Sequence, residues 1–229
     1  MTTTSHRPSR LAVIAVVLAF AAGATDAFAF LQLNGVFTAN MTGNLVLAGL
    51  TERPNYPTMI VGVVVAILVF AAALYVAFRV SPPGAPRPRN VAVLTAALVA
   101  QVAVLIGWVA VPTHLSAPMV AVLIALSSVA MACQTAVAKR IEGNSGVTTT
   151  YVTGTLTSLM GDLADRKPQD LFTRIGVIVA LVAGALSGSL LIGLDPVFGA
   201  ALPVLPALVG TVLLQTAGIR PLTRTAGAA

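Results

Sequence analysis

Charged residues are scarce in this chain. Asp, Glu, Lys and Arg make up 9% of its 229 residues, whereas soluble domains contain about 25%. Hydrophobic residues make up 57%, and they fall in blocks that are too long for ordinary strands or core helices. This composition excludes a soluble domain and a disordered chain, and it indicates an integral membrane protein.

Cysteine and histidine are almost absent. Cys133 is the single cysteine and lies inside an apolar block, while His6 and His114 are the two histidines. A disulfide needs paired cysteines, and a metal site needs several Cys, His or acidic residues at suitable spacing. We therefore expect no disulfide, no metal and no other cofactor. The sequence also lacks a phosphate-binding loop and a catalytic constellation, so an enzyme is not expected.

Six apolar blocks reach the roughly 20 residues that a helix needs to cross a bilayer. The sequence therefore predicts an all-α integral membrane fold with six transmembrane helices. The third and fourth blocks are separated by Pro112-Thr113-His114, which is typical of a tight turn. The predicted spans are Leu11–Leu33, Pro57–Phe78, Val91–Val111, Ala117–Ala138, Ile175–Leu194 and Val197–Gly218.

The basic residues set the predicted orientation, because cytoplasmic loops of membrane proteins carry an excess of Lys and Arg. Six spans with a cytoplasmic N-terminus place 12 of the 13 basic residues in the cytoplasm and leave only Arg53 outside. Eight spans would instead put Arg79, Arg87 and Arg89 outside. We therefore predict six spans with both termini in the cytoplasm. The formal net charge of +6 follows from this topology, so no nucleic-acid partner is expected.

Two further stretches are apolar but too short to span the membrane. They are Gly35–Leu50 and Gly146–Gly161, and both are rich in Thr, Asn and Gly. Irregular backbone survives inside a membrane only where protein or a water-filled cavity satisfies its polar groups. Each stretch is therefore predicted to be re-entrant, or to be the unwound continuation of a broken helix.

The short stretches also indicate an internal repeat. Gly, Val, Thr, Thr, Gly and Leu recur when residues 35–45 are aligned with 146–156, an offset of 111 residues; we name these segments the first and second Thr-Gly elements. The repeats would cover residues 11–111 and 117–218, between cytoplasmic tails at 1–10 and 219–229. Each repeat holds three spans, an odd number, so the second repeat is inverted relative to the first. Cleavage of the first span as a signal peptide would break this symmetry, so we expect the span to be retained.

Several motifs carry a resemblance to a known family. Asp26-Ala27-Phe28 precedes the first Thr-Gly element, which contains the fairly specific run Met41-Thr42-Gly43-Asn44. Gln134 precedes the second element, and Gly161-Asp162-Leu163 follows it. With these motifs the chain resembles the YoaK-like family of bacterial six-span membrane proteins, known mainly as domain of unknown function 1275. The resemblance implies a multi-pass protein of the bacterial cytoplasmic membrane, and it implies nothing about a substrate.

Asp26 is the one charged residue between Arg10 and Glu52. At about 1.5 Å per residue, it lies roughly 24 Å along the first span from Arg10. A charge at this depth costs at least about 2.5 kcal/mol on insertion scales, so Asp26 should face the bundle interior, a cavity or a hydrogen-bond partner. Two interpretations remain open: a coupling site for a proton or cation, or a side chain that ties down the unwound backbone nearby.

The Thr-Gly elements supply helix-capping residues beside glycines. If each element begins a half-helix, its free N–H groups would point into the membrane interior, where an anionic or strongly polar group could bind. Alternatively, Thr and Gly simply allow close helix packing. The first span pairs with the fourth in the repeat, which sets Asp26 near Gln134. The candidate substrate-binding residues are Asp26, Asn40, Thr42, Gly43, Asn44, Gln134, Thr149, Thr153, Gly154 and Thr155.

Gly184 and Gly188 form a Gly-x-x-x-Gly pair in the fifth span. Glycines at this spacing let two helices approach closely. Packing inside the bundle is one interpretation of the pair, and a homodimer is the other.

These features favour a membrane transporter. Inverted repeats around broken helices are typical of secondary transporters, which bind their solute between the repeats. We therefore expect transport of a small polar solute, an anion being one option, with the lipid bilayer and the solute as partners. A passive channel shares this architecture and stays open as an alternative. A membrane-embedded enzyme and a structural membrane subunit without transport activity are alternatives from other classes.

The six-span topology predicts a labelling pattern for single introduced cysteines. Cysteines that replace Arg53, Leu115 or Asp195 should react with a membrane-impermeant thiol reagent added from outside, whereas cysteines at Ala85 or Arg166 should not. Reaction at position 85 from outside would contradict the six-span topology and, with it, the inverted repeat.

Overall fold

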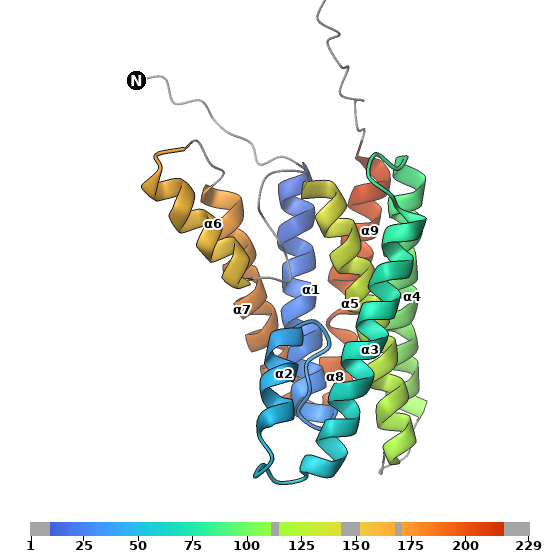
Figure 1. Cartoon of the computed structure of the whole chain (residues 1–229). Helices are drawn as coiled ribbons and strands as arrows, with labels where there is room; N and C mark the ends of the chain where they lie inside the picture. The colour runs from blue at the N-terminus through green and yellow to red at the C-terminus, as the bar shows by residue number, and fades with distance from the viewer. Residues whose placement is uncertain (1–9, 111–114, 143–151, 168–170, 218–229) are drawn as a thin grey trace, which may run out of the picture.

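The structure is a computed structural model that describes residues 10–110, 115–142, 152–167 and 171–217. These residues form a bundle of helices, and no strand occurs among them (Figure 1). The helices are α1 (Arg10–Gln32), α2 (Met41–Gly49), α3 (Tyr56–Val80), α4 (Arg87–Ala110), α5 (Ala117–Glu142), α6 (Val152–Ala164), α7 (Leu171–Leu194), α8 (Pro196–Ala201) and α9 (Val204–Thr216).

Six of the segments are long and apolar enough to cross a membrane, which confirms the six predicted spans. Five are the single helices α1, α3, α4, α5 and α7, and the sixth is Pro196–Thr216, in which α8 and α9 follow each other. The break between these two helices was not predicted. Pro203 lies at the break, and it has no N–H with which to continue the helical hydrogen bonds. The predicted turn at 112–114 lies outside the described residues.

The short helices α2 and α6 contain the helical parts of the two Thr-Gly-rich stretches, of which residues 146–151 lie outside the described residues. They contain 9 and 13 residues, which is too few to span a bilayer. Helix α1 is a complete span that ends at Gln32, and the chain then reverses through Asn34 and Gly35, which have φ values of 61° and 71°. Glycine adopts such positive φ values without strain. The chain therefore returns into the bundle through residues 36–40 before α2 leads back out (Figure 1).

Helix α2 is consequently re-entrant rather than the continuation of a broken span. Helix α6 lies toward the opposite end of the bundle from α2 (Figure 1). The two helices begin at Met41 and Val152, which are equivalent positions when the Thr-Gly elements are aligned. The duplication and its inverted orientation stay predictions.

Helix α1 packs closely along α7. A side chain on Gly23 would collide with the carbonyl oxygen of Leu181, and one on Gly184 would collide with the carbonyl oxygen of Phe20. Gly188 also faces α1, where its nearest neighbours are Ala24 and Ala27. The Gly184 and Gly188 face is therefore occupied inside the monomer, which confirms the packing interpretation. This face is not available for a homodimer.

The outer surface of the bundle is apolar. Large hydrophobic side chains in the middle of the spans are well exposed, among them Leu68 at 64%, Val99 at 62% and Val182 at 59%. Such exposure would be unfavourable in water, and it suits contact with lipid. The chain is an integral membrane protein, as its composition predicted.

Basic side chains bind backbone carbonyl groups at one end of the bundle. Arg10 and Arg87 donate to the carbonyl oxygens of Thr216 and Ala217, at the C-terminal end of α9. Arg140 donates to the carbonyl oxygen of Ser81 after α3. A cation at a helix C-terminus interacts favourably with its unpaired carbonyls and dipole. These residues therefore have a structural role besides their predicted effect on orientation, which stays a prediction.

The contact between α1 and α7 predicts opposite effects for two alanine substitutions in α7. Gly184→Ala should destabilise the protein by about 1–3 kcal/mol, because the added carbon collides with the backbone of α1. Gly193→Ala should be neutral or stabilising by up to about 1 kcal/mol, because nothing lies within 4 Å of the added carbon and alanine favours a helix. Denaturation midpoints in detergent would measure both. Equal effects would contradict the close packing.

Candidate functional site

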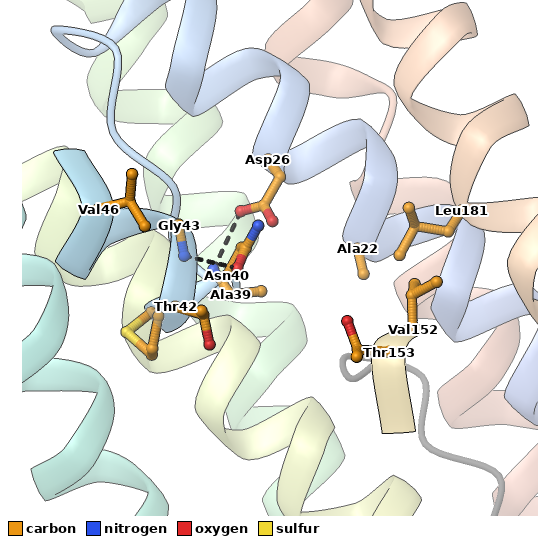
Figure 2. Close-up of a pocket in the computed structure, with 11 residues that line it drawn as sticks. Ala22, Asp26, Ala39, Asn40, Thr42, Gly43, Val46, Val152, Thr153 and Leu181 are labelled. Carbon is orange, nitrogen blue, oxygen red and sulfur yellow. Dashed lines mark hydrogen bonds between the residues drawn. The ribbon is translucent and has the colours of Figure 1, made fainter. Parts of the chain in front are cut away.

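A pocket of about 500 Å³ opens where α2 and α6 begin, beside the middle of α1 and α7 (Figure 2). One wall comes from the first Thr-Gly element and the facing wall from the second. Helix α1 contributes Asp26, and α7 contributes Leu181. The lining residues are Ala22, Asp26, Ala39, Asn40, Met41, Thr42, Gly43, Val46, Val152, Thr153 and Leu181.

Asp26 holds the irregular segment that leads into α2. Its Oδ1 atom accepts hydrogen bonds from the backbone N–H of Thr38 at 2.8 Å and of Ala39 at 3.0 Å. The Thr38 hydroxyl donates to the same oxygen at 3.1 Å. Backbone N–H groups inside a membrane need partners of this kind. The tie-down interpretation of Asp26 is therefore confirmed.

The other carboxyl oxygen of Asp26, Oδ2, is differently placed. No hydrogen bond to it occurs within the part of the chain that the structure describes. The side chain is partly exposed and lines the pocket. Asp26 thus combines a structural oxygen with an oxygen that is free to bind another group.

Asn44 completes the support of the same segment. Its side chain accepts from the Phe37 N–H at 2.9 Å and donates to the Phe37 carbonyl at 2.7 Å. Asn44 is fully buried, so these bonds replace the ones that the irregular backbone does not make with itself. Asp26 and Asn44 together fix residues 37–39 and, through them, the position at which α2 begins.

The first turn of α2 leaves two backbone donors unpaired. Asn40 is the N-cap residue, and its Oδ1 atom accepts from the Gly43 N–H at 2.9 Å (Figure 2). Within the described residues, the N–H groups of Met41 and Thr42 have no hydrogen-bond partner. Such donors at a helix N-terminus, with the positive end of the helix dipole, favour a negatively polarised group.

The second Thr-Gly element forms the opposite wall. Thr42 and Thr153 lie on facing sides of the pocket (Figure 2), and both side chains are exposed. Helix α6 is held to α7 by an ion pair in which Arg174 Nη1 lies 2.9 Å from Asp162 Oδ2. Asp162 therefore anchors α6 at the end away from the pocket.

The pocket brings together half of the predicted binding residues, namely Asp26, Asn40, Thr42, Gly43 and Thr153. Gln134 does not line it, because its side chain donates to the Leu18 carbonyl at 2.6 Å and ties α5 to α1. Asn44 serves the backbone of Phe37, and Thr155 is fully buried. Gly154 does not line the pocket either. Thr149 lies outside the described residues.

The apolar part of the lining was not predicted. Ala22 lies four residues before Asp26 on α1, and Val46 lies four residues after Thr42 on α2. Residues four apart share one face of a helix, so this spacing was the signal that would have found both. Among the residues described, no three His, Cys, Asp or Glu lie close enough to hold a metal ion.

Comparisons with known proteins agree with this description. The model of a family described as "Protein of unknown function (DUF1275)" matches residues 14–214. The UPF0700 transmembrane protein YoaK from Bacillus subtilis (strain 168) is 31% identical over 185 residues, which cover 79% of this chain and 80% of YoaK. No solved structure matches. The resemblance drawn from the Thr-Gly motifs is thereby confirmed, and the chain belongs to the DUF1275 family of transmembrane proteins.

Proposed function

We propose that this protein transports a small polar solute and binds it in the pocket between α1, α2, α6 and α7. One observation carries the proposal. Two elements 111 residues apart in sequence each place a threonine and the first turn of a short helix at a single pocket, beside the one acidic side chain deep in α1.

The cost of polar groups in a membrane supports this function. Neither α2 nor α6 is needed to cross the bilayer, and each brings polar groups into its interior. Polar groups at such depth are expensive, and in membrane proteins they mark solute or ion pathways. Asp26 and Asn44 satisfy the irregular backbone before α2. Within the described residues, Asp26 Oδ2 and the N–H groups of Met41 and Thr42 have no hydrogen-bond partner.

The placement of the two short helices suits alternating access. Helix α2 lies toward one end of the bundle and α6 toward the other, with the pocket between their N-terminal ends (Figure 1). In secondary transporters with inverted repeats, solutes bind at such paired helix ends, and one repeat rocks against the other. The repeats at 11–111 and 117–218 are the moving units in this proposal. Movement around α2 would open the pocket to one side, and movement around α6 to the other.

The lining of the pocket favours transport over catalysis. Asp26 is the single titratable residue among the described residues that line it. A general acid or base without a nucleophile, metal or second titratable group is a poor basis for an enzyme. Cys133 is buried in a separate cluster with residues of α4 and α9.

The proposal predicts that the two facing threonines support transport. In proteoliposomes, Thr42→Val and Thr153→Val should each lower the initial rate of protein-dependent solute uptake by about tenfold, the effect of losing about 1.4 kcal/mol of binding. Uptake would be screened with radiolabelled cations, anions, zwitterions and neutral metabolites.

Thr95→Val is the matched control, because Thr95 is exposed on α4 and its hydroxyl bonds only to the Val91 carbonyl in its own helix. This variant should keep the wild-type rate. Absence of protein-dependent flux for every solute would overturn the transport proposal. Equal rates for all three variants would show that the solute does not bind in this pocket.

A further inference from the structure

We propose that the solute carries a protonated amine and that this ammonium group binds Oδ2 of Asp26. The inference rests on the proposed function, because it names the chemical class that the pocket accepts. Small amines and zwitterions are the ligands in this proposal, and simple anions are excluded. This differs from the anion that the helix N-termini alone suggest.

The charge balance of the pocket favours a cationic group over a simple anion. Asp26 brings one negative charge when it is ionised, and no Lys, Arg or His occurs among the described residues that line the pocket. Basic residues near the two elements in sequence have other partners. Arg140, before the second element, donates to the Ser81 carbonyl at 2.8 Å and lies over the Phe78 ring at 4.6 Å. Arg174 pairs with Asp162 at 2.9 Å, and the Arg53 guanidinium lies over the Phe30 ring at 5.4 Å. A simple anion would therefore meet a like charge without a compensating cation.

The orientation of the Asp26 carboxyl group also favours an ammonium ligand. Three donors converge on Oδ1 at 2.8 to 3.1 Å, so the group is fixed by residues of the same chain. Oδ2 points at the pocket with no partner among the described residues (Figure 2). An ammonium group carries only donors, and its hydrogen bonds to a carboxylate are among the stronger ones in proteins. A fixed, free acceptor oxygen is the complement that an ammonium group needs.

The surroundings of Asp26 provide for the rest of the ligand. Ala39 donates to Asp26, and Met41 follows two residues later, so their nitrogens are at most about 7 Å apart. A solute bound to Oδ2 can therefore reach the unpaired N–H groups of Met41 and Thr42. The carboxylate of a small zwitterion suits these donors, and the hydroxyls of Thr42 and Thr153 can bind either end.

Asp26→Asn separates the binding role from the structural one. An asparagine keeps an acceptor oxygen for the N–H groups of Thr38 and Ala39, so the segment before α2 remains tied down. It replaces the free oxygen with an NH₂ group, which is a donor and repels an ammonium group. The matched control is Asp195→Asn, the same change at the exposed N-cap of α8, away from the pocket.

The experiment measures binding to the purified full-length protein by calorimetry. The probes are four small molecules that differ in charge: methylammonium, glycine, acetate and acetamide. Wild type and Asp195→Asn should bind methylammonium or glycine at least about tenfold more tightly than acetate, and Asp26→Asn should lose at least about tenfold of the amine affinity. Thermal denaturation would establish that each variant is folded. If Asp26→Asn fails to fold, the preference of wild type for amines over acetate decides alone.

Three results would overturn the inference: preferential binding of acetate or acetamide, amine binding that Asp26→Asn leaves unchanged, or no binding of either amine. The transport proposal would survive these results if the proteoliposomes took up an anion or a neutral solute. It fails separately, if no solute of any class enters.

Discussion

Backbone N–H and C=O groups inside a bilayer cannot be left without partners, and the geometry of the candidate site follows from this requirement. Residues 36–40 form an irregular segment, with bends at Thr38 and Ala39, whose backbone does not make the hydrogen bonds of a helix. Asp26 accepts hydrogen bonds from the N–H groups of Thr38 and Ala39. Asn44 accepts from the N–H group of Phe37 and donates to its carbonyl oxygen. Two buried or half-buried side chains therefore make a re-entrant helix possible in this bundle.

The same hydrogen bonds also position one wall of the pocket. Because Asp26 belongs to α1, the start of α2 is fixed relative to the central helix of the bundle. Helix α1 is in turn fixed against α7 through Gly23 and Gly184, and α7 carries α6 through the pair of Arg174 and Asp162. Both walls of the pocket are thus attached to one pair of closely packed helices.

Hydropathy and charge predicted the six spans, because the cost of crossing a membrane is nearly a sum over residues. Asp26 and the threonines of the two elements could be selected as candidate site residues for the same reason, because polar and charged side chains are costly in a membrane. The role of Gln134 was not predictable, because its partner is a carbonyl on α1 and depends on how two uniformly apolar helices are rotated against each other. Asn44 was assigned to the solute, yet it serves Phe37, seven residues away. Such pairings follow from the path of the chain, which residue types alone do not define.

The candidate site requires the first turns of α2 and α6 to meet at a water-accessible pocket inside the membrane. Single cysteines at Thr42 and Thr153, in a Cys133→Ala background, test it through their rate of reaction with a small charged thiol reagent, which requires a hydrated thiolate. Leu68→Cys and Val182→Cys are the controls, since both positions lie in the middle of spans on the exposed apolar surface. Positions 42 and 153 should react at least about tenfold faster than the controls, because only they reach water. Reaction at 42 and 153 as slow as at 68 and 182 would contradict it.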